Sequence, residues 1–253
     1  MVRKIFVVLL LFCVSISWAQ PVNQVDSKGR KQGIWEKTYP DSRALVYRGE
    51  FKNDKPVGTF YYFYPSTKKK IIIVHDPNSV RSAAWMYHEN GVLMGYGIYR
   101  NQEKDSVWTH YGPSGRLSYK ETYSKGVLNG TKTIYYVPED PNDKSARVAR
   151  IENYKDGVRH GKFTEYFDYG VIKSTGNYEN GKKRGKYTVN HPNGKPMIIE
   201  QYKYGNRHGW AFGYDSNGAQ TGKRYYKFGR EISGQELKDW LEDCKKRGVS
   251  PNN

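Results

Sequence analysis

Four stretches of this chain repeat one pattern, and that pattern decides the fold. They read YSKGVLNG at residues 123–130, YKDGVRHG at 154–161, YENGKKRG at 178–185 and YKYGNRHG at 202–209. Each has the form Y-x-x-G-x-x-x-G, and the closing glycines of the last three stand 24 residues apart twice. Self-similarity at a fixed period of about 20 to 50 residues indicates a stacked repeat array.

The repeat covers most of the chain when the closing residue of each stretch is taken as the start of a unit. The units then begin at Gly33, Gly58, Ala83, Ser106, Gly130, Gly161, Gly185 and Gly209. Two residues after these starts lie Trp35, Phe60, Trp85, Trp108, Lys132, Phe163, Tyr187 and Ala211. Seven residues before the next start lie Phe51, Asp76, Tyr99, Tyr123, Tyr154, Tyr178, Tyr202 and Tyr226. These two columns did not enter the choice of frame, so their largely aromatic character supports it.

Each unit has room for two short strands and two turns, which predicts a β-hairpin. In the sixth unit we expect strands over residues 162–167 and 171–178, joined by a turn at 168–170. Asn180-Gly181 then favours a two-residue turn with positive φ. The other turn glycines of this kind are Gly126, Gly157, Gly205 and Gly229. The prediction is an all-β protein, an elongated single-layer antiparallel meander of about eight β-hairpin repeats, roughly sixteen strands and on the order of 75 Å long.

A second aromatic position lies five residues after the start, and it has the opposite parity to the first. Its members are Phe63, Tyr111, Tyr135, Tyr166 and Tyr214. Successive strand residues point to opposite faces of a sheet. Either both faces carry aromatic side chains, or a bulge lies between the two positions.

The two ends of the chain depart from the repeat. Residues 1–19 have a basic start, an apolar run and a small residue at Ala19, the pattern of a cleaved secretory signal peptide. Residues 20–232 form the repeat array, and residues 233–253 change to helical periodicity, with Leu237, Trp240, Leu241 and Cys244 on one face. Ser233 and Glu236 have the spacing of a capping box. We therefore expect an exported chain (periplasmic, outer-envelope or secreted) with a short C-terminal capping helix.

The composition argues against an enzyme with a buried pocket. The net charge is +17, and Leu, Ile, Val and Phe together number 50 of the 253 residues. That fraction is near the level of about one fifth below which charged chains tend to be disordered. The 23 Tyr, 6 Trp and 26 Gly compensate, because aromatic rings bury large areas and glycine permits tight turns. The balance favours a thin, turn-rich β structure.

The sequence lacks the motifs that carry common chemistries. No H-x-x-x-H, C-x-x-C or G-x-S-x-G element is present, and loss of Cys13 with the signal would leave Cys244 without a disulfide partner. His160 and His208 hold the same repeat position two units apart, roughly 19 Å in a meander, which is too far to share a metal. We read them as turn residues at a solvated edge. No catalytic residue, metal site or cofactor is predicted.

Basic residues cluster at predicted turns and strand ends, notably Lys68, Lys69 and Lys70, and Lys182, Lys183 and Arg184. They are candidates for contact with an anionic partner such as lipid head groups or an acidic glycan. The alternative is that they keep a long sheet soluble, since lysine protects sheet edges. Nucleic acid is not an expected partner, and the oligomeric state stays open.

The unit Y-x-x-G-x-x-x-G-x-[WF] resembles the MORN repeat, in the bacterial variant form known as the YwqK-like antitoxin family. The resemblance covers about residues 26–232. It implies an elongated β-hairpin array that binds proteins or membranes, with no catalytic residues. Three functions follow from these observations: an exported scaffold that binds a protein or an anionic envelope component, a carbohydrate-binding aromatic array, or an antitoxin-type partner that neutralises a protein. The predicted export opposes the last, because antitoxins act in the cytosol.

Overall fold

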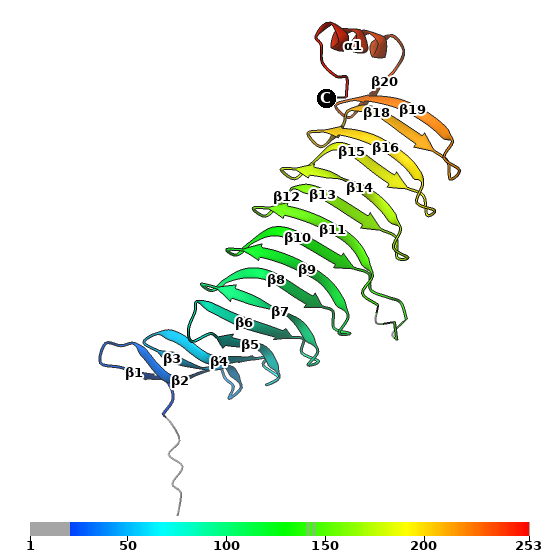
Figure 1. Ribbon diagram of the computed structural model, residues 1–253. Helices are drawn as coiled ribbons and strands as arrows, with labels where there is room; N and C mark the ends of the chain where they lie inside the picture. The colour runs from blue at the N-terminus through cyan, green and yellow to red at the C-terminus, as the bar shows by residue number, and fades with distance from the viewer. Residues whose placement is uncertain (1–20, 141, 144, 253) are drawn as a thin grey trace, which may run out of the picture.

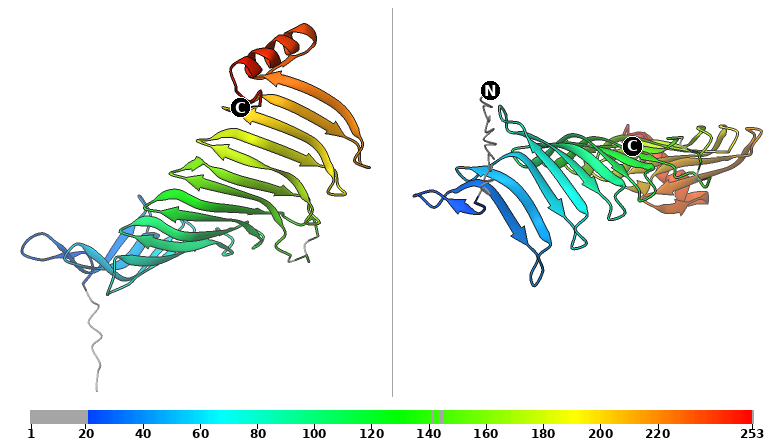
Figure 2. Two further views of the ribbon diagram at one scale, coloured as in Figure 1. Left: turned by 45° about the horizontal axis from the view of Figure 1, so that its top comes forward. Right: turned by 90° about the horizontal axis from the view of Figure 1, so that it is seen from below.

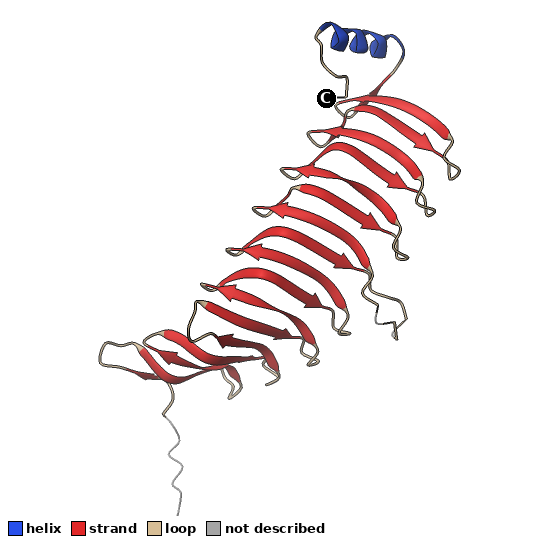
Figure 3. Ribbon diagram, in the orientation of Figure 1, coloured by secondary structure: helices blue, strands red, loops and turns tan. Residues whose placement is uncertain are grey.

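The protein is one long antiparallel sheet followed by a helix (Figures 1 and 3). The computed structural model describes residues 21–140, 142–143 and 145–252, so the predicted signal peptide lies outside the described residues. Within these residues the sheet has 20 strands that pair antiparallel in chain order, except that β13 pairs with β11 and β18 pairs with β16. Two further views show the sheet twisting along its length (Figure 2). The predicted all-β, single-layer meander with a C-terminal helix is confirmed.

The strands of the first half alternate direction along the sheet. They are β1 Gln24–Val25, β2 Lys31–Thr38, β3 Leu45–Lys52, β4 Lys55–Phe63, β5 Lys69–His75, β6 Arg81–Tyr87, β7 Leu93–Arg100, β8 Glu103–Tyr111, β9 Leu117–Ser124 and β10 Val127–Tyr135. The second half continues with β11 Val148–Lys155, β12 Val158–Arg159, β13 Gly161–Tyr166, β14 Ile172–Glu179, β15 Lys182–Asn190, β16 Pro196–Lys203, β17 Asn206–Arg207, β18 Gly209–Tyr214, β19 Gln220–Lys227 and β20 Arg230–Ile232. The short β12 and β17 pair with the same strands as β13 and β18, respectively.

Two kinds of turn lie along the two long edges of the sheet (Figure 1). At one edge the turns have two central residues with positive φ, as predicted: Asn180 has φ 48° and Gly181 has φ 79°. We call this the tight-turn edge. At the other, the loop edge, longer loops close with a hydrogen bond such as that from the backbone N–H of His191 to the carbonyl of Lys195, 2.8 Å. The described residues of the longer loop between β10 and β11 also belong to this edge.

A bulge follows the tight turn in most units. In the seventh unit Thr175 pairs with Thr188 and Asn177 pairs with Arg184, so Gly176 alone faces three residues of β15. The start residue Gly185 lies in that bulge with φ 70°, a conformation that glycine adopts without strain. The extra residues bring Tyr187 opposite Gly176. We call the face of the sheet that carries the Tyr187 ring the ladder face.

Both faces of the sheet carry aromatic side chains, which is the first of the two alternatives left open by the sequence. On the ladder face, Trp108 stacks with His110 at 6.4 Å between ring centroids. On the opposite face, Tyr111 stacks with Tyr96, also at 6.4 Å. The side chains of β8 therefore alternate between the two faces, as an ordinary strand requires.

The core of this single-layer sheet consists of rings that lie on glycines of the neighbouring strand. Phe60 covers Gly49 and Trp108 covers Gly97; a Cβ atom on either glycine would stand 2.2 Å from a ring atom. Trp108 is 0% exposed and Phe60 is 3% exposed, although no second layer covers this face within the described chain. Tyr99 completes the enclosure of Trp108, at 4.9 Å between ring centroids.

The third unit begins one residue earlier than the sequence frame placed it. Ser82 pairs with Tyr99, as Ser106 pairs with Tyr123 in the fourth unit, so the unit starts at Ser82 and not at Ala83. The strands β5 and β6 pair without a register shift, because a longer loop replaces the tight turn and its bulge. As a result Ala84 occupies the ring position of the ladder face. The predicted ladder residue Trp85 points to the opposite face.

The helix α1, Gly234–Lys246, covers the end of the sheet (Figure 1). Its predicted apolar face is confirmed: Cys244 is 1% exposed, and the indole N–H of Trp240 donates to the Tyr225 hydroxyl at 2.7 Å. The predicted capping box is wrong. Ser233 makes no side-chain cap bond, and Glu236 pairs with Arg230 instead. In the part of the chain that the structure describes, no helix has the length and apolarity to cross a membrane.

The ring-on-glycine contact gives a direct stability test. We expect Gly97→Ala to destabilise the fold by about 1 to 3 kcal/mol, because its methyl group collides with the enclosed Trp108 ring. Gly222→Ala is the matched control, since Gly222 is also a strand glycine but has no atom within 4 Å of the added carbon. Thermal and urea unfolding of both variants measures the difference. Equal unfolding midpoints would show that the contact does not limit stability.

Candidate binding surfaces

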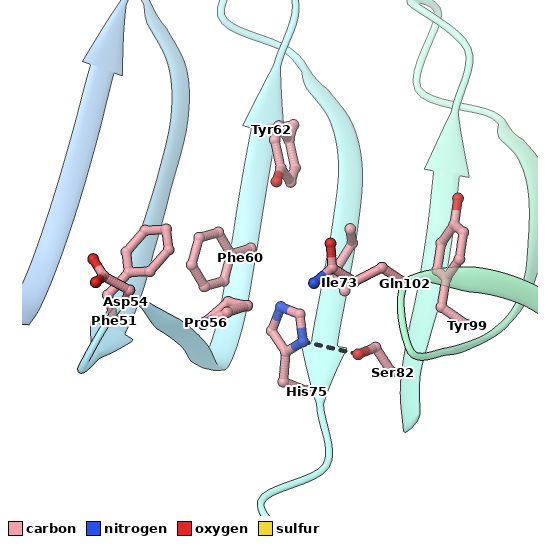
Figure 4. Close-up of a pocket in the computed structure, with 10 residues that line it drawn as sticks. All are labelled: Phe51, Asp54, Pro56, Phe60, Tyr62, Ile73, His75, Ser82, Tyr99 and Gln102. Carbon is pink, nitrogen blue, oxygen red and sulfur yellow. Dashed lines mark hydrogen bonds between the residues drawn. The ribbon is translucent and has the colours of Figure 1, made fainter. Parts of the chain in front are cut away.

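The largest departure from the repeat creates a hollow on the ladder face (Figure 4). Its volume is about 450 Å³, and it spans β3 to β7. Aromatic and aliphatic side chains form most of the wall, with polar groups between them. The lining residues are Phe51, Asp54, Pro56, Phe60, Tyr62, Ile73, His75, Ser82, Tyr99 and Gln102. We call it the third-unit hollow, because the third unit supplies its floor.

Side-chain exchanges in and beside the third unit open this space. Ala84 stands where the neighbouring units place Phe60 and Trp108. On the preceding strand Ala84 pairs with Ile73, whereas Phe60 and Trp108 lie on a glycine of their preceding strand. His75 pairs with Ser82 and takes the place that Tyr99 or Tyr123 has in other units. A large ring is therefore missing between Phe60 and Tyr99.

Apart from the Asp54 carboxylate at the rim, the polar groups that line the hollow are uncharged. The His75 Nδ1 atom lies 2.8 Å from the Ser82 hydroxyl, and burial lowers the pKa of this histidine. Burial also raises the pKa of Tyr62 and Tyr99, which keeps both phenols protonated. A serine beside a histidine is two thirds of a nucleophilic triad. Within the described residues, however, His75 packs edge-on against Phe60 at 5.3 Å and has no carboxylate to orient it.

A chain of buried carboxylates crosses the middle of the ladder face. Glu121, Glu152 and Glu200 hold the position that glycine has beneath Phe60 and Trp108, and all three are buried. Each accepts a hydrogen bond of 2.9 Å from the tyrosine two residues later. Lys132, which replaces the ring of the fifth unit, lies 2.8 Å from Glu121. Arg150 and Arg159 pair with Glu152, and Arg207 pairs with Glu200.

The sequence patterns did not lead us to predict these carboxylates, although the sequence contains a signal for them. They stand nine residues before a unit start and form the motif E-x-Y with Tyr123, Tyr154 and Tyr202. Single glutamates look like ordinary surface charges, and only alignment on the repeat shows that this position alternates between Gly and Glu. The structure gives the reason, because a glycine makes room for a ring whereas a glutamate neutralises a neighbouring cation.

The hydrogen bonds of this chain shift the acidities of its members. Burial would raise the pKa of the Glu121 carboxyl, but hydrogen bonds from Lys132 and Tyr123 hold it below the ordinary value. Burial and the bond to Glu121 raise the pKa of Tyr123 to about 12. Burial also lowers the pKa of the nearby His110. The group is therefore a structural ion pair at neutral pH.

The two predicted basic clusters do not form one surface. Lys68, Lys69 and Lys70 are exposed at the loop edge, where β5 begins. Lys182, Lys183 and Arg184 begin β15 at the tight-turn edge. Nine strand spacings separate β5 from β15, or roughly 43 Å. The two groups are therefore separate patches on opposite edges.

Within the second cluster, Lys183 has a different role from its neighbours. Its ammonium lies 3.9 Å from the Tyr187 ring centroid and 4.8 Å from that of Tyr202, on the ladder face. Lys31 and Lys104 lie between two rings in the same way in other units. Lys182 and Arg184 are exposed and remain available to a partner.

Exposed aromatic residues stand at two tight turns beside this cluster. Tyr204 and Phe228 hold the first position of their turns with φ 51° and 46°, where an aromatic residue is unfavourable. Tyr204 is 62% exposed, and the Arg184 guanidinium lies 5.5 Å from its ring centroid. Together with Lys182, Lys183, Arg184 and Glu179 it borders a hollow of about 290 Å³. We call Tyr204, Lys182 and Arg184 the tip patch.

The predicted position of the histidines at a solvated edge is wrong for His208. It is buried, with its ring 4.4 Å from Phe228 and 6.2 Å from Trp240. His160 is half-buried, and its backbone N–H bonds to the carbonyl of Asn153 at 2.9 Å. Among the described residues, no group of three or more His, Cys, Asp or Glu side chains is placed to hold a metal ion.

The remaining predicted repeat residues form the ladder and its turns. The start glycines Gly33, Gly58, Gly130, Gly161, Gly185 and Gly209 and the turn glycines Gly126, Gly157, Gly181, Gly205 and Gly229 all have positive φ. Trp35, Phe163 and Tyr187 pack against neighbouring rings on the ladder face. No protein-family model matches the chain, and no curated protein matches it.

The buried ion pair predicts a pH-dependent stability. Because the pKa of Glu121 is lowered in the folded state, its contribution is present above about pH 4 and is lost as the pH falls. Lys132→Met leaves the buried carboxylate without its ammonium and should cost roughly 2 kcal/mol at pH 7. The deficit should shrink as the pH is lowered and Glu121 becomes protonated.

Thermal melts between pH 3.5 and 7 would measure this effect, where these pH limits bracket the ordinary glutamate pKa of about 4.3. Lys186→Met is the control, because Lys186 is an exposed strand residue. A deficit for Lys132→Met that stays constant with pH would contradict the ion-pair assignment. In that case the loss would reflect packing of the lysine stem.

Proposed function

We propose that this protein is an exported, non-enzymatic scaffold that binds an anionic component of the cell envelope through the tip patch. The observation that carries the proposal is Tyr204, an exposed aromatic residue at a strained turn position with Arg184 beside its ring. An aromatic ring with flanking cations is the combination that contacts the head-group region of a membrane or an anionic surface. The other partner expected from the sequence, a protein, is the competing outcome of the binding test.

The charges of the tip patch are suited to a partner because other residues hold them weakly. Arg184 faces Glu179 at 3.7 Å, and both side chains are about half exposed. Exposed pairs of this kind contribute little stability. Lys182 is exposed at the start of β15. By contrast, Lys132, Arg150 and Arg207 are bound to buried glutamates and have structural roles.

The overall charge supports the same partner. Loss of residues 1–19 would remove Arg3 and Lys4 and leave a net charge of +15 from the original +17. A strongly basic protein accumulates at anionic surfaces, and the attraction is screened over about 8 Å at physiological ionic strength. Binding should therefore weaken as salt is added.

A non-enzymatic role fits the arrangement of the titratable groups. The buried carboxylates are each paired with a cation and a tyrosine hydroxyl. Catalytic groups usually have pKa values displaced toward neutral pH and a free position for a reacting atom. Around Glu121 the displacements run the other way: the pKa of Glu121 is lowered and those of Tyr123 and Lys132 are raised, which keeps each group in its ordinary charge state.

The aromatic ladder itself is a poor binding surface. The rings of Phe60, Trp108 and Phe163 are buried by their neighbours, so a ligand cannot stack on them. An array-wide sugar-binding ladder, the second function considered from the sequence, is therefore not supported. The antitoxin-type function has no structural observation in its favour.

Export is tested by the amino terminus of the native protein. We expect mass spectrometry to find Gln20, in part cyclised, as the first residue, because the signal pattern ends at Ala19. The protein should be recovered with the envelope or in the medium. A full-length chain that begins at Met1 in the cytosol would overturn the proposed location.

Binding is tested with the protein and lipid vesicles. We expect sedimentation with vesicles of phosphatidylcholine and phosphatidylglycerol but not with phosphatidylcholine alone. Lys182→Gln with Arg184→Gln should weaken binding roughly tenfold or more, since each cation contributes about 1 kcal/mol near an anionic surface. Tyr204→Asn should weaken binding without unfolding the turn, because asparagine favours positive φ.

The controls separate charge from position. Lys125 has φ 49° and holds the turn position of Tyr204 in a unit outside the tip patch. Lys125→Asn therefore removes a cation from a comparable turn. It should reduce binding much less than the tip-patch variants. Equal losses in all variants would point to general attraction by the net charge. Binding that salt does not weaken, or no binding to anionic vesicles or lipopolysaccharide, would favour a protein partner instead.

A further inference from the structure

The third-unit hollow is preformed, because packing outside it fixes both of its walls. Phe60 is held by Gly49 beneath it and by Phe51 at 5.1 Å between ring centroids. On the other side, Tyr99 is held against Trp108 at 4.9 Å. Figure 4 shows Phe60 and Tyr99 on either side of His75 and Ser82. A ligand would therefore find its site built, at little cost in ordering side chains.

The size of the hollow matches a small ring. Its volume of about 450 Å³ lies in the range of about 300 to 1,000 Å³ that small-ligand sites occupy. The hollow lies where the repeat changes, with Ile73 in the place of a glycine and His75 in the place of a tyrosine. The departures from the repeat thus remove one six-membered ring from the ladder and leave the rings on both sides in place.

The polar groups of the hollow select the chemistry of the ligand. Ser82, His75 and Gln102 supply hydroxyl, imidazole and amide groups, and Tyr62 and Tyr99 supply phenol hydroxyls. A purely apolar ligand would strip water from these groups without replacing its hydrogen bonds, which is costly. Asp54 at the rim has one oxygen bonded to the backbone N–H of Lys31 at 2.8 Å and would repel an anion. The ligand should therefore be neutral and rich in hydroxyl groups.

We propose that the third-unit hollow binds a neutral pyranose ring, as a terminal sugar or a residue of a glycan. The sugar packs an apolar ring surface against Tyr99, while the buried Phe60 closes the other end of the hollow. Its hydroxyls exchange hydrogen bonds with Ser82, Gln102 and the Asp54 carboxylate. This site is distinct from the tip patch, since it lies on β3 to β7 and the tip patch lies on the turns beside β15 and β16.

The test is a titration of the protein with neutral methyl glycosides of glucose, galactose, mannose and N-acetylglucosamine, followed by amide chemical shifts. At least one glycoside should give saturable shifts in the millimolar range, centred on β5 to β7. His75→Tyr should abolish them. This variant gives the second unit the tyrosine that other units carry at this position, so it fills the hollow and keeps the repeat.

A matched pair of serine variants tests the polar contact. Ser82→Gly removes a hydroxyl from the hollow and should weaken binding roughly five- to tenfold, the effect of one hydrogen bond of about 1 kcal/mol. Ser106→Gly makes the same change at the same repeat position of the fourth unit and should leave the affinity unchanged. Both variants are checked for folding by circular dichroism.

Three results would overturn the proposal. The first is the absence of saturable shifts with every neutral glycoside. The second is binding that persists in His75→Tyr, which would place the sugar elsewhere. The third is tighter binding of an apolar ring such as phenol or indole than of any glycoside. None of these results bears on vesicle binding by the tip patch, so the two proposals fail separately.

Discussion

The close contact between a ring and a bare backbone is the constraint on which this structure depends. A single-layer sheet has no second layer to bury its apolar side chains, so the core must form within one face. Trp108 and Phe60 achieve this because they lie on Gly97 and Gly49, where no Cβ keeps them from the neighbouring strand. The start residue, Gly58 or Ser106, lies with positive φ in the bulge that brings the ring to that position. Strand pairing and burial are therefore satisfied by the same few residues.

The middle of the array solves the same packing problem with charges. Where Lys132 replaces a ring, it pairs with Glu121 on the preceding strand, in the place of glycine, and with Glu152 on the following strand. A buried lysine needs a carboxylate, and the carboxylates need further donors, which Tyr123 and Tyr154 provide. This exchange keeps the repeat geometry and links the stability of the central units to the ionisation of Glu121.

Ring packing on glycine and glutamate–cation pairing together determine which parts of the surface are free to bind a partner. The rings and charged groups of the ladder face pack or pair with one another. Partners must therefore bind at the places where the repeat is irregular. One is the third-unit hollow, where Ile73, His75 and Ser82 depart from the repeat. The other is the tight-turn edge, where Tyr204 occupies a turn position that asparagine or aspartate holds in most other units. The edges of the sheet are short strands, β1 and β20, and offer little to a pairing partner.

The sequence by itself determined the repeat, the hairpin turns and the helical end, because turn glycines, Tyr columns and the apolar face of Leu237 to Cys244 are local signals with fixed spacing. It left open which face each ring occupies, and it misplaced the third unit by one residue. The tertiary structure decided these points, since a side chain's face depends on the register of pairing with the next strand and on whether a bulge intervenes. The hollow and the buried glutamates follow from that register, so a pattern along one chain could not reveal them.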